Sequence, residues 1–409
     1  MGSVEGAVVM ESNMNAAVAA AAAASAAADV EERNNDESMI TNLHLHSIPT
    51  LNLDQGDPTV YEAYWKSVGE NVKISISASQ SLSYFANPNS FCWFLVPKLE
   101  QEIKILHSLV GNAVVDGRHI VVGNGSSQLI QAALYALADP LDPPTPITVV
   151  SAVPFYSCYP QITDYVRSGL YKWGGDANAY DKDEAYIELV TSPNNPDGEI
   201  RGPVVKRANG MLLHDLAYYW PQYTAITAPA DHDVMLFTLS KCTGHAGSRI
   251  GWAVVKDAEV AKKMVKFIEI NTIGVSKEAQ LRAASILEMI SANGCSGGFF
   301  EFGQSVMAER WKKLREALRG SEVLEVPHFP LKYCNYNRDF IGSNPAYAWV
   351  KAKPGVQLEK AMNEERIRVR GGTSFGCPSN YVRLSMLGKH EDFDLFLKRL
   401  PSIIQLLAV

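Results

Sequence analysis

The sequence lacks the features that mark several classes of protein. It contains no run of about 18 bulky apolar residues, so we expect no membrane-spanning helix. It has no basic run and carries a formal net charge of −7 at pH 7, which argues against a broad nucleic-acid surface. The glycine spacings of dinucleotide-binding and Walker loops are also missing, so adenine dinucleotides and nucleoside triphosphates are not indicated.

Cysteine is scarce, and its distribution suggests no structural cross-links. The six cysteines include no Cys-x-x-Cys pair, so we expect no zinc site, no disulfide framework and a reduced, cytoplasmic compartment. The N-terminus lacks the basic segment and bulky apolar core of a signal peptide and the arginine-rich composition of a transit peptide. Residues 1–47 are rich in alanine and then in acidic and polar side chains, which predicts a disordered tail.

What is present is typical of an α/β enzyme. Hydrophobic residues make up 47% and charged residues 20% of the 409 residues, enough for a large domain with a smaller lobe. Strand and helix patterns alternate through the middle of the chain, which predicts a mostly parallel central sheet flanked by helices. We expect the large domain at 97–280 and a smaller α+β lobe built from 48–96 and 281–409.

One strand is followed by a loop of small residues suited to phosphate. The apolar run 119–123 leads into Asn-Gly-Ser-Ser-Gln at 124–128, and a helix is predicted at 129–138. Exposed N–H groups and the positive end of a helix dipole attract an anion, and glycine lets the backbone approach it closely. Ser126 and Ser127 are therefore candidate phosphate ligands. The alternative is that one of them merely caps the helix.

Four further strands, at 147–150, 187–191, 211–215 and 234–237, each lead into a residue whose side chain could bind a ligand or take part in catalysis. These residues are Tyr156, Asn195, Asp215 with Tyr218, and Lys241. Ligands of α/β sheets bind at the carboxyl ends of the strands, so we expect these side chains to share one site. Taken singly, each could be an ordinary turn residue, and Asp215 could cap a helix.

The stretch around Lys241 has a pattern of its own. Thr238 and Ser240 precede or adjoin the lysine, a turn of small residues follows, and Arg249 comes eight residues later. An amine in this position could form an imine with an aldehyde cofactor, and the hydroxyls and guanidinium could hold a phosphate. The alternative is a strand, a glycine-rich turn and two solvated basic residues.

Other segments carry weaker patterns. Alternation predicts a short strand at 73–77, and the aromatic cluster 91–95 is more typical of a core than of a ligand site. Helices are predicted at 98–110, 258–268, 277–290, 300–319 and from 391, and strands at 347–350 and 381–385.

Four motifs together resemble a known family. They are Leu-Asp-Gln-Gly-Asp-Pro at 53–58, Ser-Pro-Asn-Asn-Pro-Asp-Gly at 192–198, His-Asp-Leu-Ala-Tyr-Tyr-Trp-Pro at 214–221 and the segment 240–252. The chain from about residue 51 onward resembles the fold type I aminotransferases that use pyridoxal 5'-phosphate, and within them the plant alliinase-like branch, which includes tryptophan aminotransferases of auxin synthesis. The resemblance implies that fold, that cofactor and a homodimer with shared active sites.

The resemblance also implies a role for each candidate. Lys241 would bind the cofactor covalently, Asp215 would pair with its pyridine nitrogen, and Asn195 with Tyr218 would bind its phenolic oxygen. Tyr156 would stack on the ring. The phosphate ligands would be Ser126, Ser127, Thr238, Ser240, Arg249 and, from the neighbouring subunit, Tyr84. Arg383 would bind the substrate α-carboxylate, with the segment at Gly56 closing over it.

The implied reaction transfers the amino group of L-tryptophan to pyruvate, giving indole-3-pyruvate and alanine. Aromatics near Tyr84, Phe85 and 91–94 could take the indole, although they could equally be core. No second arginine stands out in a motif, so aspartate and glutamate should be poor donors. The main alternative is a carbon–sulfur lyase like the alliinases, which carry a cysteine-rich region ahead of the catalytic part; here no cysteine precedes Cys92. A non-catalytic binding protein is the third possibility.

Overall fold

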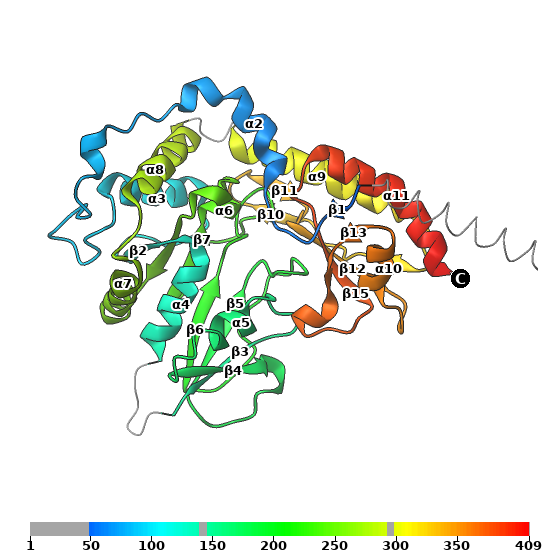
Figure 1. The fold of residues 1–409 in the computed structure, drawn as a ribbon, viewed down its shortest axis with the longest axis horizontal. Helices are drawn as coiled ribbons and strands as arrows, with labels where there is room; N and C mark the ends of the chain where they lie inside the picture. The colour runs from blue at the N-terminus through cyan, green and yellow to red at the C-terminus, as the bar shows by residue number, and fades with distance from the viewer. Residues whose placement is uncertain (1–48, 139–144, 293–297, 409) are drawn as a thin grey trace, which may run out of the picture. The chain divides into compact units, whose positions relative to one another are not determined.

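The computed structural model describes residues 49–138, 145–292 and 298–408, and Figure 1 shows their arrangement. The predicted tail at 1–47 lies outside the described residues. Residues from Leu51 onward form one compact unit in which a seven-stranded sheet is flanked by helices and is followed along the chain by smaller sheets. The predicted α/β class with a central sheet is confirmed.

The central sheet is mostly parallel. In spatial order its strands are β2 (His119–Gly123), β8 (Gly251–Val255), β7 (Val234–Thr238), β6 (Gly210–Asp215), β5 (Tyr186–Thr191), β3 (Ile147–Ser151) and β4 (Tyr171–Asp176). Only β8 runs antiparallel to its neighbours, β2 and β7. Every residue of β3, β5, β7 and β8 is buried, as expected for strands covered on both faces.

Helices cover both faces of this sheet. On one face α4 (Gly125–Leu137) packs against β7, β8 and α7 (Ala258–Thr272), and α5 (Tyr159–Asp164) packs on β4. On the other face α3 (Pro97–Val110) pairs with α8 (Lys277–Ala292). Successive residues of β8 point to opposite faces of the sheet and show which helices lie on which face. Gly251 faces the start of α4, whereas Trp252 donates a hydrogen bond to His107 of α3 at 2.9 Å.

The C-terminal part contains an antiparallel sheet of four strands. Their order is β14 (Arg370–Gly371), β15 (Tyr381–Ser385), β12 (Tyr347–Ala352) and β9 (Leu324–Glu325). A hairpin of β10 (Lys332–Cys334) and β11 (Asp339–Ile341) precedes β12 in the chain. The helices of this part are α9 (Phe299–Ala317), α10 (Leu358–Glu364) and α11 (His390–Ala408), shown in yellow to red in Figure 1.

The first described segment joins this C-terminal sheet. β1 (Leu51–Asn52) pairs in parallel with β13 (Ile367–Arg368), and the N–H of Ser385 donates to the carbonyl of Leu53 at 2.8 Å. Leu53 and Asp54 therefore lie beside β15, where Arg383 donates to the carbonyl of Asp54. The chain continues into α2 (Glu62–Ser67) and three 3-10 helices, Thr59–Tyr61, Gly69–Val72 and Ala78–Ser81. Three other 3-10 helices lie at Ala177–Ala179, Ala246–Ser248 and Gly372–Phe375.

Two local predictions are wrong. Residues 73–77 form no strand: Ile74 and Ile76 are half-buried and their neighbours exposed, which gives the alternation, but the segment has no strand partner among the described residues. Helix α4 begins at Gly125 rather than at 129, with Asn124 as its N-cap, so neither Ser126 nor Ser127 caps it. The division into domains at 97 and 280 stays a prediction.

Candidate active site

A cavity of about 200 Å³ opens at the carboxyl ends of the central strands. Loops after β2, β3, β5, β6 and β7 converge there, as the strand-end argument predicts. Ten of the candidate residues line it: Ser126, Ser127, Tyr156, Asn195, Asp215, Tyr218, Thr238, Ser240, Lys241 and Arg249. Thr191 and the small side chains of Ala217 and Ala246 complete the lining.

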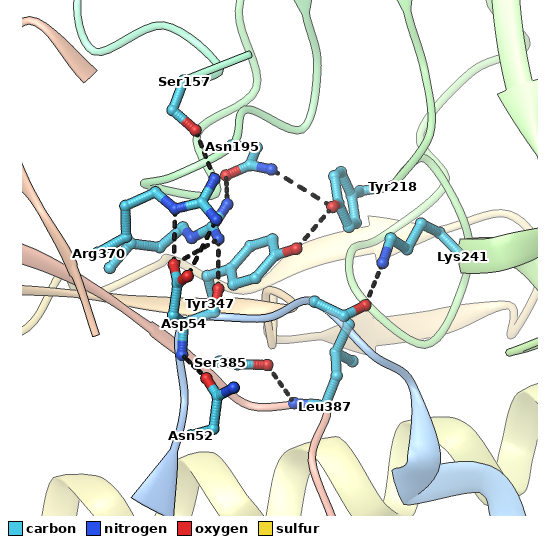
Figure 2. Close-up of polar contacts among 12 residues, drawn as sticks. Asn52, Asp54, Ser157, Asn195, Tyr218, Lys241, Tyr347, Arg370, Ser385 and Leu387 are labelled. Atoms are coloured by element: carbon cyan, nitrogen blue, oxygen red, sulfur yellow. Dashed lines mark hydrogen bonds and ion pairs between the residues drawn. The ribbon is translucent and has the colours of Figure 1, made fainter. Parts of the chain in front are cut away.

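Lys241 lies in α6 (Leu239–Cys242), the short helix that follows β7. Its backbone carbonyl accepts hydrogen bonds from Gln222 and Tyr223, both at 3.1 Å, which fix the turn. The Nζ atom donates to the carbonyl of Gly56 (Figure 2). Burial lowers the pKa of the amine from its usual 10.5, so a larger share of it is neutral, and hence nucleophilic, than in a solvated lysine.

Asp215 ends β6 and points its carboxylate into the cavity. One oxygen accepts from the N–H of Ala217 at 3.2 Å and the other from the Tyr159 hydroxyl at 3.1 Å. A turn rather than a helix follows, so the alternative of a helix cap is wrong. Burial raises the pKa of Asp215 to about 6, which a cationic ring nitrogen beside it would reverse.

The part of the cavity lining around Gly125 and Arg249 offers donors for an anion. Gly125 has a φ of +75°, and a Cβ there would overlap Nη2 of Arg249, so glycine allows the start of α4 to lie against the guanidinium. Nη1 of Arg249 donates to the carbonyl of Ala246 at 3.0 Å and to Oγ of Ser240 at 3.5 Å. A guanidinium, several hydroxyls and a helix N-terminus are the donors that a phosphate requires.

This donor set fits pyridoxal 5'-phosphate. Arg249, Ser126, Ser127 and Ser240 could hold its phosphate, and the buried Asp215 carboxylate could hold the proton of its ring nitrogen. The Thr238 hydroxyl accepts from the N–H of Ser240 at 3.2 Å, so it also shapes the turn.

A second cavity, of about 700 Å³, adjoins the first and shares Tyr156, Tyr218, Lys241 and Ala246 with it. Gly56 and Arg383, the two candidates for the substrate, line this larger cavity. Arg383 is buried; its Nη1 donates to Oδ1 of Asn195 at 3.0 Å and its Nη2 to the carbonyl of Asp54 at 2.7 Å. These two acceptors are neutral groups, and the nearest carboxylate, that of Asp54, forms only a long ion pair with Nη2 at 3.9 Å.

Tyr347 is a site residue that the motifs do not reveal. Its hydroxyl accepts from that of Tyr218 at 3.1 Å, and the centre of its ring lies 4.1 Å from the guanidinium carbon of Arg383 (Figure 2). Although burial alone would raise the pKa of Tyr347, the nearby charges of Lys241 and Arg383 hold it below 10. The strand at 347–350 was predictable; the register that places this hydroxyl beside Tyr218 was not.

The aromatics predicted to be near an indole lie away from both cavities. Tyr84 is 62% exposed and packs on the rings of Phe85 and Trp93, and Phe85 is 47% exposed. None of Tyr84, Phe85 and 91–94 lines either cavity, and Phe94 is buried, which favours the core alternative over an indole pocket in the same chain. The role of Tyr84 toward the neighbouring subunit's phosphate stays a prediction.

Other features of the described residues bear on classes of function. The five cysteines among them, which exclude Cys295, are unpaired. Within 49–138, 145–292 and 298–408, no group of three or more His, Cys, Asp or Glu side chains is placed to bind a metal ion. The helices of the same ranges include none that is both long and apolar enough to cross a bilayer.

Comparisons with known proteins point to one family. The family model described as "Allinase" matches residues 51–404. Tryptophan aminotransferase-related protein 2 of Arabidopsis thaliana is 54% identical over 357 residues, which cover 86% of this chain and 81% of the relative. Tryptophan aminotransferase-related protein 1 of Oryza sativa subsp. japonica is 51% identical, in an alignment that covers 86% of this chain and 83% of the relative. Alliin lyase 1 of Allium sativum is 37% identical, in an alignment that covers 86% of this chain and 74% of the relative.

A solved structure supports the fold. An aminotransferase from Staphylococcus aureus superposes with a TM-score of 0.64 at 18% identity, covering 88% of this chain and 95% of that one. An identity this low bears on the fold alone, and that fold is the one the motifs predict.

Proposed function

This chain belongs to the alliinase family, and from that premise we propose that it is a pyridoxal-phosphate-dependent aminotransferase that transfers the amino group of L-tryptophan to pyruvate. The products are indole-3-pyruvate and alanine, the former serving auxin synthesis. Lys241 carries the proposal: it lines both cavities, the one that contains Asp215 and the one that contains Arg383. An activated amine thus adjoins a cofactor pocket and a carboxylate-binding pocket.

The residues of the chain divide the chemistry among them. When bound, pyridoxal phosphate supplies an electron sink for the electron pair of a bond broken at the substrate Cα. Arg383 grips the α-carboxylate and so orients that bond. The neutral amine of Lys241 removes the Cα proton as a general base, and Asp215 keeps a proton on the ring nitrogen. Asn195 and Tyr218, joined by a hydrogen bond of 3.4 Å, hold the phenolic oxygen.

The choice of tryptophan rests on the names of the relatives at 54% and 51% identity. The larger cavity supports it by its size, since about 700 Å³ accommodates an indole side chain. We expect kcat/KM to be highest for tryptophan, lower for phenylalanine and tyrosine, and lowest for alanine and aspartate, because burying a large ring contributes a few kcal/mol. Steady-state rates with pyruvate present test this order, and a preference for aspartate would contradict it.

The alliin lyases at 37% identity make β-elimination the alternative chemistry. It uses the same Cα proton transfer but expels a group from Cβ. S-alkyl cysteine sulfoxides are therefore the discriminating substrates: release of pyruvate and ammonia from them, faster than transamination of tryptophan, would favour the lyase.

We also propose a homodimer with shared sites and a cytoplasmic location. The unpaired cysteines suit a reducing compartment. The exposure of Tyr84 suits a side chain that completes the site of a second subunit. We expect the Tyr84→Ala and Lys241→Ala homodimers each to be impaired, because every site lacks one group.

Co-refolding the two variants tests the shared site. A heterodimer of Tyr84→Ala with Lys241→Ala contains one site in which both residues are intact, so we expect activity to return. Tagging each chain differently allows the heterodimer to be purified and assayed alone. Activity no higher than that of the Tyr84→Ala homodimer would contradict the shared site.

A further inference from the structure

A second arginine lines the larger cavity. Arg370, on β14, faces it together with Arg383 and Lys241, although no sequence motif singles it out. The motifs indicate no second arginine, yet the structure places one at the cavity. A guanidinium binds a carboxylate bidentately, so two available arginines would favour a substrate with two carboxylates. Whether Arg370 is available depends on its partners.

The carboxylate of Asp54 already binds the guanidinium of Arg370. Nε of Arg370 donates to Oδ1 of Asp54 at 2.6 Å and Nη2 donates to Oδ2 at 3.2 Å, which is the bidentate geometry of a bound carboxylate (Figure 2). Nη1 donates to Oγ of Ser157 at 2.8 Å, so each of the three nitrogens has a partner. The side chains of Arg370 and Asp54 are only 25% and 26% exposed, so water screens this pair less than a surface pair.

The hydrogen-bond partners of Arg383 differ from those of Arg370. Its two hydrogen-bonded partners are the amide oxygen of Asn195 and the backbone carbonyl of Asp54, and the Asp54 carboxylate is 3.9 Å away. Among the described residues its buried Nε has no hydrogen-bond partner. Asp54 therefore contacts the two arginines differently. Its carboxylate forms a bidentate pair with Arg370 but only a long ion pair, at 3.9 Å, with Arg383, which its backbone carbonyl binds instead.

We propose that Asp54 determines the substrate class by acting as a built-in carboxylate at Arg370. The inference rests on the proposed aminotransferase function and specifies its selectivity. The α-carboxylate of any substrate binds Arg383, whereas a second carboxylate would meet the negative charge of Asp54 instead of a free guanidinium. Amino and oxo acids with one carboxylate, such as tryptophan and pyruvate, are accepted, and aspartate, glutamate and 2-oxoglutarate are rejected.

The test compares inhibition of the holoenzyme by succinate, with two carboxylates, and butyrate, with one. Asp54→Asn retains the backbone carbonyl that bonds Arg383 but removes the charge that neutralises Arg370. We expect the ratio of the succinate to the butyrate inhibition constant to fall about tenfold, with a parallel gain in kcat/KM for glutamate relative to tryptophan. Adding Arg370→Gln to this variant should abolish the gain, because the freed guanidinium is its source.

Ser157→Ala is the matched control. It removes a neutral partner of Arg370 and leaves the ion pair, so its inhibition ratio should equal that of the wild type. An unchanged ratio in Asp54→Asn, or a gain that persists without Arg370, overturns the proposal. Should Asp54→Asn not fold, Arg370→Gln alone decides. Asp54 then keeps only its 3.9 Å ion pair with Arg383 and should weaken succinate more than butyrate, so an unchanged ratio overturns the proposal.

The proposed aminotransferase function and the proposed role of Asp54 can be refuted independently of each other. Both inhibitors can be titrated through the visible spectrum of the cofactor-loaded protein, without turnover. Absence of indole-3-pyruvate from the wild type would then refute the tryptophan assignment, while the succinate-to-butyrate ratio would still report on Asp54.

Discussion

Replacing Lys241 by alanine is expected to remove both covalent cofactor attachment and nearly all activity. Lys241 is the amine that lines both cavities, and burial lowers its pKa, so it is suited to bind an aldehyde and then to move the Cα proton. Losing both roles should reduce kcat on the order of 10⁴-fold or more. Borohydride reduction followed by peptide mass spectrometry should find the cofactor on Lys241 in the wild type and on no peptide of the variant.

Lys389→Ala is the matched control for this variant, because Lys389 also lines the larger cavity. It should retain covalently bound cofactor and its visible absorbance. Cofactor trapped on Lys389, or on any lysine other than Lys241, would refute the assignment.

The substitution Asp215→Asn should separate activity from stability. An amide cannot hold a proton on the ring nitrogen as a carboxylate does, so we expect kcat to fall by about 10²- to 10³-fold, the usual cost of losing one electrostatic group in an active site. The variant should still bind the cofactor, because Lys241 and the phosphate donors are intact. Wild-type turnover in Asp215→Asn would reject the role.

The same substitution should stabilise the cofactor-free protein at high pH. Burial raises the pKa of Asp215 from 3.8 to about 6, so between these values the folded protein binds a proton that the unfolded chain has released. Stability therefore decreases as pH rises through this window and stays reduced above it. The neutral amide of the Asp215→Asn variant has no such penalty. Denaturant unfolding should show a gain of roughly 3 kcal/mol at pH 8 and none below pH 3.8. An equal difference at both pH values would contradict this explanation.

Much of the cofactor pocket could be predicted because its residues occupy strand ends. Apolar runs identify the central strands, and the carboxyl ends of parallel strands meet at one edge. That reasoning places Asn195, Asp215 and Lys241 together without knowledge of any distance. The glycine at 125 predicts a close backbone approach to an anion; the structure shows the backbone there against the guanidinium of Arg249, a candidate ligand of that anion.

The substrate side of the site was less predictable because it depends on pairing between segments far apart in the chain. Asp54 meets Arg370 only because β1 pairs with β13 and β14 pairs with β15. Tyr347 reaches Tyr218 through the register of β12 against β15. No local pattern encodes these registers, so the sequence does not single out Tyr347 or Arg370 as site residues.

The aromatic cluster was left with two interpretations, a core and an indole pocket. Its composition suits both, because composition does not tell which surface a ring faces. Phe94 is buried in the core, whereas Tyr84 and Phe85 face outward. The rings that line the larger cavity are Tyr156, Tyr218 and Tyr347, all from strands or strand ends.

The most direct test of the proposed function is to incubate the purified holoenzyme with L-tryptophan and pyruvate and to identify the products. A transaminase forms indole-3-pyruvate and alanine in equal amounts, stops when pyruvate is omitted, and releases no ammonia. We expect this result, and we expect it to be lost in Lys241→Ala. Absence of indole-3-pyruvate, together with release of pyruvate and ammonia from S-alkyl cysteine sulfoxides, would contradict the aminotransferase assignment and identify a lyase.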